Sequence, residues 1–129
     1  MSRLLIAEDD PGTSRLYQSY AQRRGHEVLL ARDGAETLLL AAAEMPDVIL
    51  LDVAMPKLDG RDVLRELRSN AKTSGIPILV VSAMAADANF RSHVLGLGAD
   101  DVLEKPIDLA ATFSRAERLA LRGRGAGEP

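Results

Sequence analysis

The chain has 129 residues, a net charge of −3 and no cysteine, and 47% of its residues are hydrophobic but only 3% aromatic. This length and composition suit one domain with a single core built mainly from Leu, Val, Ile and Ala. The absence of cysteine excludes disulfides and thiolate metal sites, and the weakly negative charge disfavours non-specific nucleic-acid binding. The apolar stretch near the N-terminus, Leu4–Ala7, is too short for a signal peptide or a membrane span, so we expect a cytoplasmic protein.

Five short apolar runs, taken in chain order, predict five strands. The runs are Arg3–Glu8, Glu27–Arg32, Asp47–Asp52, Ile76–Ser82 and Asp101–Glu104. Most of them consist of Leu, Ile and Val without polar alternation, which is typical of strands buried on both faces of a sheet.

The segments between these runs carry the period of a helix, about 3.6 residues. In Gly34–Met45 the periodic apolar positions are Ala35, Leu38, Leu39 and Ala42, and in Arg61–Ser69 they are Val63, Leu64 and Leu67. A last helix is expected over Leu109–Leu121.

Capping residues mark where the expected helices begin and end. The expected N-caps are Asp10 before Pro11, Asp33 with Glu36 three residues later, and Asp59 before Gly60, and the expected stops are Gly25 and Gly98. Alternating strands and helices predict one α/β domain over residues 1–122, with a parallel sheet covered by helices on both faces. Residues 123–129 have no apolar face, so we expect a flexible tail there.

Polar residues gather where the predicted strands end. The first strand ends in Glu8, Asp9 and Asp10, the third in Asp52, the fourth in Ser82 and the fifth in Glu104 and Lys105. Ligands of open α/β sheets bind beyond the carboxyl ends of the strands, so we expect these side chains to converge at one edge. Taken singly, each has an ordinary structural explanation, as a solvated acid, a helix cap, a turn hydroxyl or a surface lysine. Chance convergence of four strand ends is a weaker explanation than a shared site.

The residue types at these ends suit phosphoryl transfer. Crowded carboxylates repel one another, so one pKa should rise, and a hard cation such as Mg²⁺ relieves the repulsion. Ser82 can donate to a phosphoryl oxygen, and Lys105 supplies a compact positive charge for the same group. The carboxylate that faces the gap, Asp52, would then be the nucleophile.

These residues resemble the receiver domain of two-component response regulators. The matching stretches are LLIAEDD (4–10), PDVILLDVAMPKLDG (46–60), IPILVVSA (76–83) and GADDVLEKP (98–106), in the order found in the family. The resemblance covers residues 3–122. It implies a five-stranded, doubly wound parallel sheet in the order 2-1-3-4-5, a flavodoxin-like (CheY-like) three-layer sandwich.

The resemblance also implies a role for each matching residue. Asp52 matches the phosphoacceptor, Ser82 the switch hydroxyl, and Lys105 a lysine joined to Pro106 by a cis peptide bond. The implied Mg²⁺ ligands are Asp9, Glu8 (usually through water), Asp52 and the backbone carbonyl of Ala54. The implied donor is a phosphohistidine of a sensor histidine kinase or a histidine phosphotransfer protein, and phosphorylation would switch binding to a downstream protein. The implied protein phosphorylates and dephosphorylates itself, is otherwise not an enzyme, and binds neither nucleic acid nor a membrane directly.

The chain departs from the family pattern at several positions. Val102 stands where Tyr or Phe usually swings inward, Ile107 replaces a usual Phe, and the segment Ser82–Gly98 is one residue longer than usual. We therefore expect the signal to leave through the loop after Ser82 and the fourth helix, with little change at Val102. Neither Ala54 nor Met84 has a polar group to guide water, so a phosphorylated Asp52 should be long-lived.

Other functions fit the sequence less well. A flavodoxin would need a phosphate loop that is not acidic and aromatic residues around a flavin, and an aspartyl-phosphate hydrolase would need Asp in place of Ala54. A P-loop motif is absent. A degenerate receiver that only binds protein partners stays open as an alternative. The charged residues Arg91, Asp100, Asp101, Arg115 and Arg118 form either a solvated surface or a face for partners, including a homodimer through the fourth helix, fifth strand and fifth helix.

Overall fold

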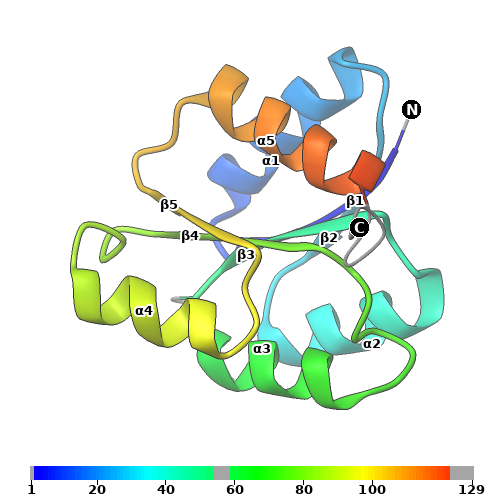
Figure 1. Ribbon diagram of the computed structural model, residues 1–129. Coiled ribbons are helices and arrows are strands. Elements are labelled where there is room, and N and C mark those ends of the chain that lie inside the picture. The colour runs from blue at the N-terminus through cyan, green and yellow to red at the C-terminus, as the bar shows by residue number, and fades with distance from the viewer. Residues whose placement is uncertain (1, 54–58, 123–129) are drawn as a thin grey trace.

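The computed structural model describes residues 2–53 and 59–122, which form a sheet between two layers of helices (Figure 1). The strands are β1 (Arg3–Ala7), β2 (Glu27–Ala31), β3 (Val48–Asp52), β4 (Ile78–Ser82) and β5 (Asp101–Glu104). The helices are α1 (Pro11–Arg23), α2 (Gly34–Glu44), α3 (Gly60–Ser69), α4 (Ala88–Gly96) and α5 (Leu109–Arg122). All strand pairs are parallel and the order is β2-β1-β3-β4-β5, which confirms the predicted fold.

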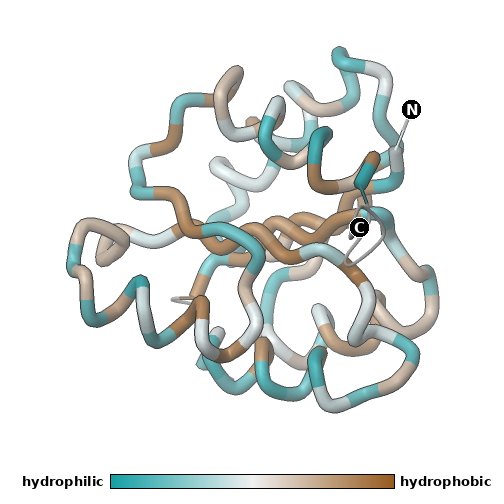
Figure 2. Tube along the Cα trace, viewed as in Figure 1, coloured by the Kyte–Doolittle hydropathy of each residue, from teal (hydrophilic) through white to brown (hydrophobic). Residues whose placement is uncertain are grey.

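The two faces of the sheet are covered by different helices. Helices α1 and α5 lie on one face, and α2, α3 and α4 lie on the other (Figure 1). Along β1, Leu4 and Ile6 pack on the face covered by α1 and α5, whereas Leu5 and Ala7 pack on the face covered by α2, α3 and α4. Figure 2 shows the apolar residues concentrated along the strands. Because side chains alternate across a strand, an unbroken apolar run is what a strand buried on both faces requires.

The predicted N-caps are confirmed by their hydrogen bonds. Asp10 accepts from the Thr13 N–H at 2.8 Å, and Asp33 accepts from the Glu36 N–H at 2.9 Å. Glu36 itself accepts from the N–H of Arg32, one residue before the cap. Each bond satisfies an amide that has no partner within its helix.

Three glycines stand where the backbone leaves no room for a side chain or adopts a conformation that other residues avoid. Gly25 and Gly98 follow α1 and α4 with φ of 93° and 114°, a region that L residues rarely adopt. A Cβ at Gly60 would lie 2.3 Å from the Cα of Val53, so α3 can approach the end of β3 only without a side chain there.

The buried face of α2 differs from the expected one. Ala35 and Leu39 are exposed, Leu39 to 68%, and the buried residues include Thr37 and Ala41. The Thr37 hydroxyl donates to the carbonyl of Asp33 at 2.8 Å, so its burial leaves no polar group unpaired. The predicted face is therefore right at Leu38, which packs against the core, and wrong at Ala35 and Leu39.

The other core predictions hold more closely. In α3, Val63, Leu64 and Leu67 are fully buried, as expected. Phe90 and Phe113 are also buried, and the strands end within two residues of the predicted positions. None of the helices in residues 2–53 and 59–122 is both long and apolar enough to cross a membrane.

Candidate functional site

Three carboxylates meet at the carboxyl edge of the sheet. Glu8 and Asp9 follow β1, and Asp52 ends the neighbouring strand β3, so that one oxygen from each lies within 4.8 Å of the others. Glu8 and Asp52 are each only 3% exposed, whereas Asp9 is exposed to solvent. The buried strand therefore holds Asp52 rigidly at this edge, as its sequence position predicted.

Lys105 forms an ion pair with each of the two buried acids. Its Nζ lies 2.8 Å from Asp52 Oδ2 and 3.1 Å from Glu8 Oε1. It directly follows β5 and is joined to Pro106 by a cis peptide bond. Partial burial lowers the pKa of Lys105, but the hydrogen bonds and charges of Asp52 and Glu8 outweigh it, so the pKa is raised and Lys105 stays cationic.

The pKa of Glu8 is raised, as expected for one member of the acid cluster. The main cause is burial, which removes water from the charged form, and repulsion by Asp52 adds to it. Hydrogen bonds from the Asp10 N–H and from Lys105 oppose the rise. The predicted direction is right, but desolvation contributes more than the crowding on which the expectation rested.

Ser82 lies at the end of β4, the strand paired with β3, where Asp52 stands opposite Val81. Its side chain is buried, and its Oγ accepts a hydrogen bond from the Met84 N–H at 3.0 Å. A pocket of about 300 Å³ opens beside it, lined also by Val53 and Phe90. The hydroxyl keeps its proton for an acceptor, so Ser82 can donate to an anion bound at this edge.

The donor set fits a hard divalent cation. Glu8, Asp9 and Asp52 offer only oxygen, and Mg²⁺ is bound in proteins through one or two carboxylates while it keeps several waters. Asp9 is exposed to solvent, so a cation held by these carboxylates would keep its waters on the side of Asp9. The carbonyl of Ala54, the further expected ligand, belongs to a residue outside the described ones.

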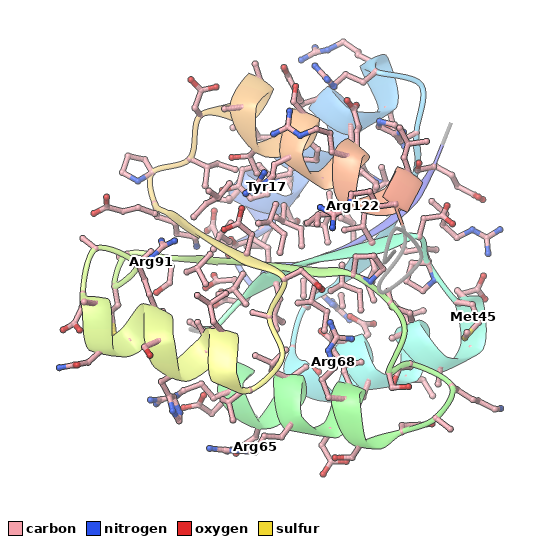
Figure 3. The ribbon with its side chains drawn as sticks, viewed as in Figure 1. Tyr17, Met45, Arg65, Arg68, Arg91 and Arg122 are labelled. Atoms are coloured by element: carbon pink, nitrogen blue, oxygen red, sulfur yellow. The ribbon has the colours of Figure 1, made fainter. Side chains whose placement is uncertain are left out.

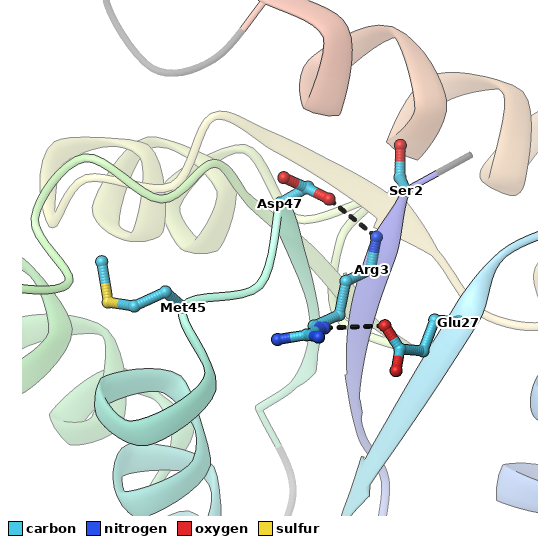
Figure 4. A pocket seen from close by; sticks show the side chains of 5 residues that line it. All are labelled: Ser2, Arg3, Glu27, Met45 and Asp47. Atoms are coloured by element: carbon cyan, nitrogen blue, oxygen red, sulfur yellow. Dashed lines mark hydrogen bonds and ion pairs between the residues drawn. The ribbon is translucent and has the colours of Figure 1, made fainter.

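A pocket at the opposite edge of the sheet has a different character. It measures about 300 Å³ and is lined by Ser2, Arg3, Glu27, Met45 and Asp47 (Figure 4). Arg3 is already engaged there, with its Nε 2.9 Å from Glu27 Oε1 and its backbone N–H 2.7 Å from Asp47. The pocket lies far from the acid cluster in the fold and shares no residue with it.

The charges that could have formed a partner face are largely used within the chain. Asp100 pairs with Arg68 at 2.9 Å, and Asp101 pairs with Arg115. Arg91 donates to the carbonyl of Val102 at 2.8 Å, a contact that no sequence pattern indicated.

The comparisons with known proteins agree with the geometry. The chain matches the family model of the response regulator receiver domain over residues 4–117. It is 37% identical to Protein PilH of Pseudomonas aeruginosa, an alignment that covers 84% of this chain and 88% of PilH. It is 40% identical to the response regulator MprA of Mycolicibacterium vanbaalenii over 98% of this chain, and it spans 54% of MprA. It also spans half of RpaA, a DNA-binding dual master transcriptional regulator of Synechocystis, at 36% identity.

Solved structures give the same result. The receiver domain of the Francisella response regulator 1452 has a TM-score of 0.88 at 30% identity and covers 95% of this chain and 98% of its own. The receiver domain of the Pseudomonas aeruginosa sensor histidine kinase PA1611, with a magnesium ion coordinated in its active-site cleft, has a TM-score of 0.83 at 28% identity and covers 92% of this chain and 97% of its own. The chain therefore belongs to the response regulator receiver domain family.

Proposed function

We propose that Asp52 accepts a phosphoryl group from a phosphohistidine of a sensor histidine kinase or a histidine phosphotransfer protein. The observation that supports this most directly is the position of Asp52, which is held at the end of β3 beside two acids and 2.8 Å from Lys105. A carboxylate held in place by a hydrogen bond to a neighbouring ammonium group can act as a nucleophile.

The step conserves atoms and charge in a simple way. An oxygen of Asp52 attacks phosphorus, a P–O bond forms, and the P–N bond to the donor imidazole breaks. The imidazole nitrogen takes up a proton as it leaves. Because little covalent chemistry is required of the protein, positioning and charge stabilisation carry most of the rate.

Glu8, Asp9 and Asp52 would hold Mg²⁺, with Ala54 as a further candidate. When bound, the ion neutralises charge on the transferring phosphoryl oxygens. Lys105 and Ser82 supply the remaining donors. Lys105 already contacts Asp52, and Ser82 lies on the adjacent strand, so both can donate to oxygens of the new phosphoryl group.

The output of this reaction is a change in protein binding. We propose a downstream protein partner, and self-association through α4, β5 and α5 as one form that it takes. On this proposal the domain occupies residues 1–122, acts in the cytoplasm, contacts neither nucleic acid nor membrane itself, and catalyses only its own phosphorylation and dephosphorylation. The assembled set of acids, hydroxyl and lysine supports this function over a receiver that binds partners without phosphorylation.

The test is intact-mass analysis after incubation with a small phosphodonor and Mg²⁺. Wild type should gain one phosphoryl group, and Asp52→Asn should gain none. Asp62→Asn, in an exposed ion pair on α3, is the matched control and should be labelled like wild type. Stoichiometric labelling of Asp52→Asn would overturn the assignment.

A further inference from the structure

The side chain of Arg91 links helix α4 to the sheet by a hydrogen bond, in addition to the packing of Phe90 and Val94 in the core. Arg91 Nη1 donates to the carbonyl of Val102 on β5 at 2.8 Å and makes a longer contact, 3.5 Å, with the carbonyl of Ala85 in the β4–α4 loop. Figure 3 shows Arg91 extending from α4 toward the strands. The guanidinium therefore joins three segments that follow one another around this edge of the molecule.

The carbonyl of Val102 needs a partner because β5 is an edge strand. It pairs with β4 alone in the sheet order, and Val102 stands opposite Val80. The N–H of Val102 is bonded to Asp101 Oδ1 at 2.8 Å, and Arg91 takes the carbonyl. Both polar groups of this edge residue are thus satisfied by side chains, and Arg91 fixes α4 against the strand.

The second acceptor of Arg91, the carbonyl of Ala85, belongs to the loop that follows Ser82. The carbonyl of Ser82 accepts from the Ala85 N–H at 3.3 Å, and its Oγ accepts from the Met84 N–H at 3.0 Å. Residues 83–85 are therefore folded against Ser82 by two hydrogen bonds. A Ser82 hydroxyl that moves toward Asp52 weakens the bond to Met84, and the loop that carries the Ala85 carbonyl is then free to shift.

We propose that Arg91 is the positioning residue that transmits this shift to α4 and to the edge of β5. The inference rests on the proposed phosphorylation of Asp52. It adds the route by which phosphorylation would change the position of α4. Val102 is buried and β-branched, so its side chain has little freedom to transmit the change itself. Arg91 has two carbonyl acceptors on two different segments, and exchange between them gives α4 two discrete attachments.

NMR with beryllofluoride as the phosphoryl mimic tests this proposal. In wild type, addition of the mimic with Mg²⁺ should shift the amides of Asp52, Ser82 and residues 88–96. In Arg91→Met, which keeps the aliphatic stem and removes the donors, the shifts at Asp52 and Ser82 should persist. Those in α4 should fall to about half or less, since single residues on a coupling route change its strength by that order. Arg91→Lys keeps a cationic donor group and should recover part of the α4 response.

The control is Arg118→Met, an exposed arginine on α5, which should respond like wild type. An Arg91→Met variant whose α4 shifts equal those of wild type would overturn the proposal while leaving phosphorylation of Asp52 intact. A lysine variant with no recovery would also contradict a role carried by the hydrogen bond. Absence of any shift at Asp52 in wild type would instead refute the proposed function.

Discussion

Single side chains at the acid cluster have to satisfy two opposing demands. Glu8 and Asp52 are buried, and a buried carboxylate is costly unless it is paired, yet a cation at this site would need their oxygens as ligands. Lys105 resolves this conflict by contacting both. Its Nζ stands in for the charge that Mg²⁺ would bring, and its own side chain is 27% exposed.

Replacement of Lys105 should therefore destabilise the protein most when no metal is present. We expect Lys105→Met to lower the free energy of unfolding by about 2 kcal/mol in metal-free buffer, because it leaves two buried carboxylates without a cation. Saturating Mg²⁺ should recover part of the loss, since the ion binds only the folded site. Urea unfolding with and without Mg²⁺ measures both effects, with Lys72→Met on an exposed loop as control. Equal stability of wild type and Lys105→Met in metal-free buffer would show that Lys105 does not balance these charges.

At the scale of elements, Arg68 on α3 links the segment before β4 to the turn before β5. Arg68 donates to the carbonyls of Ile76 at 2.7 Å and Gly98 at 2.9 Å, and it pairs with Asp100 at 2.9 Å. Its side chain is only 12% exposed, and Figure 3 shows it between α3 and the sheet, whereas Arg65 one turn earlier points outward. The start of β4 and the turn before β5 are thus both held by one guanidinium.

The two arginines should differ sharply on substitution. Arg68→Met should cost about 3 kcal/mol of unfolding free energy, because the carbonyls of Ile76 and Gly98 lose a donor and the carboxylate of Asp100 loses its cationic partner. Arg65→Met removes an exposed pair with Asp62 and should leave stability near that of wild type. Denaturant unfolding of both variants measures the difference. Because both replace Arg by Met, the change in charge and side-chain volume is the same. A loss at Arg65 as large as at Arg68 would contradict the role assigned to burial.

For the whole molecule, the sequence predicts the sheet and the acid cluster better than it predicts the contacts between layers. Asp52 could be placed because a buried strand has a defined carboxyl end, and all such ends of a parallel sheet meet at one edge. The apolar pattern did not predict that Thr37 faces the core, because a hydroxyl can be buried when it donates to a nearby carbonyl, here that of Asp33. The roles of Arg68 and Arg91 depend on which distant carbonyls a long, flexible side chain reaches, and no local pattern encodes that.

The last such contact joins α5 to the edge of the sheet far from the acid cluster. Glu117 accepts from Arg24 Nη2 at 2.6 Å and lies 2.6 Å from His26 Nε2, so its carboxylate joins α5 to the connection between α1 and β2, more than 90 residues away in sequence. The hydrogen bonds from Arg24 contribute most to lowering the pKa of Glu117 from 4.5 to about 2. A carboxylate whose pKa is depressed by folding stabilises the protein above its unfolded pKa, and that stabilisation is lost as the pH falls through the folded value.

Glu117→Gln should therefore lower the unfolding free energy by about 1 to 2 kcal/mol at neutral pH, a figure that allows for solvent screening of a partly exposed pair. The difference from wild type should stay constant above pH 4.5 and shrink as the pH is lowered toward about 2, where Glu117 is itself protonated. Urea unfolding at a series of pH values measures this curve. Glu66→Gln, at an exposed position on α3, should show no such dependence. A difference between Glu117→Gln and wild type that persists unchanged below pH 4.5 would mean that Glu117 stabilises the junction of α1, β2 and α5 by packing rather than by charge.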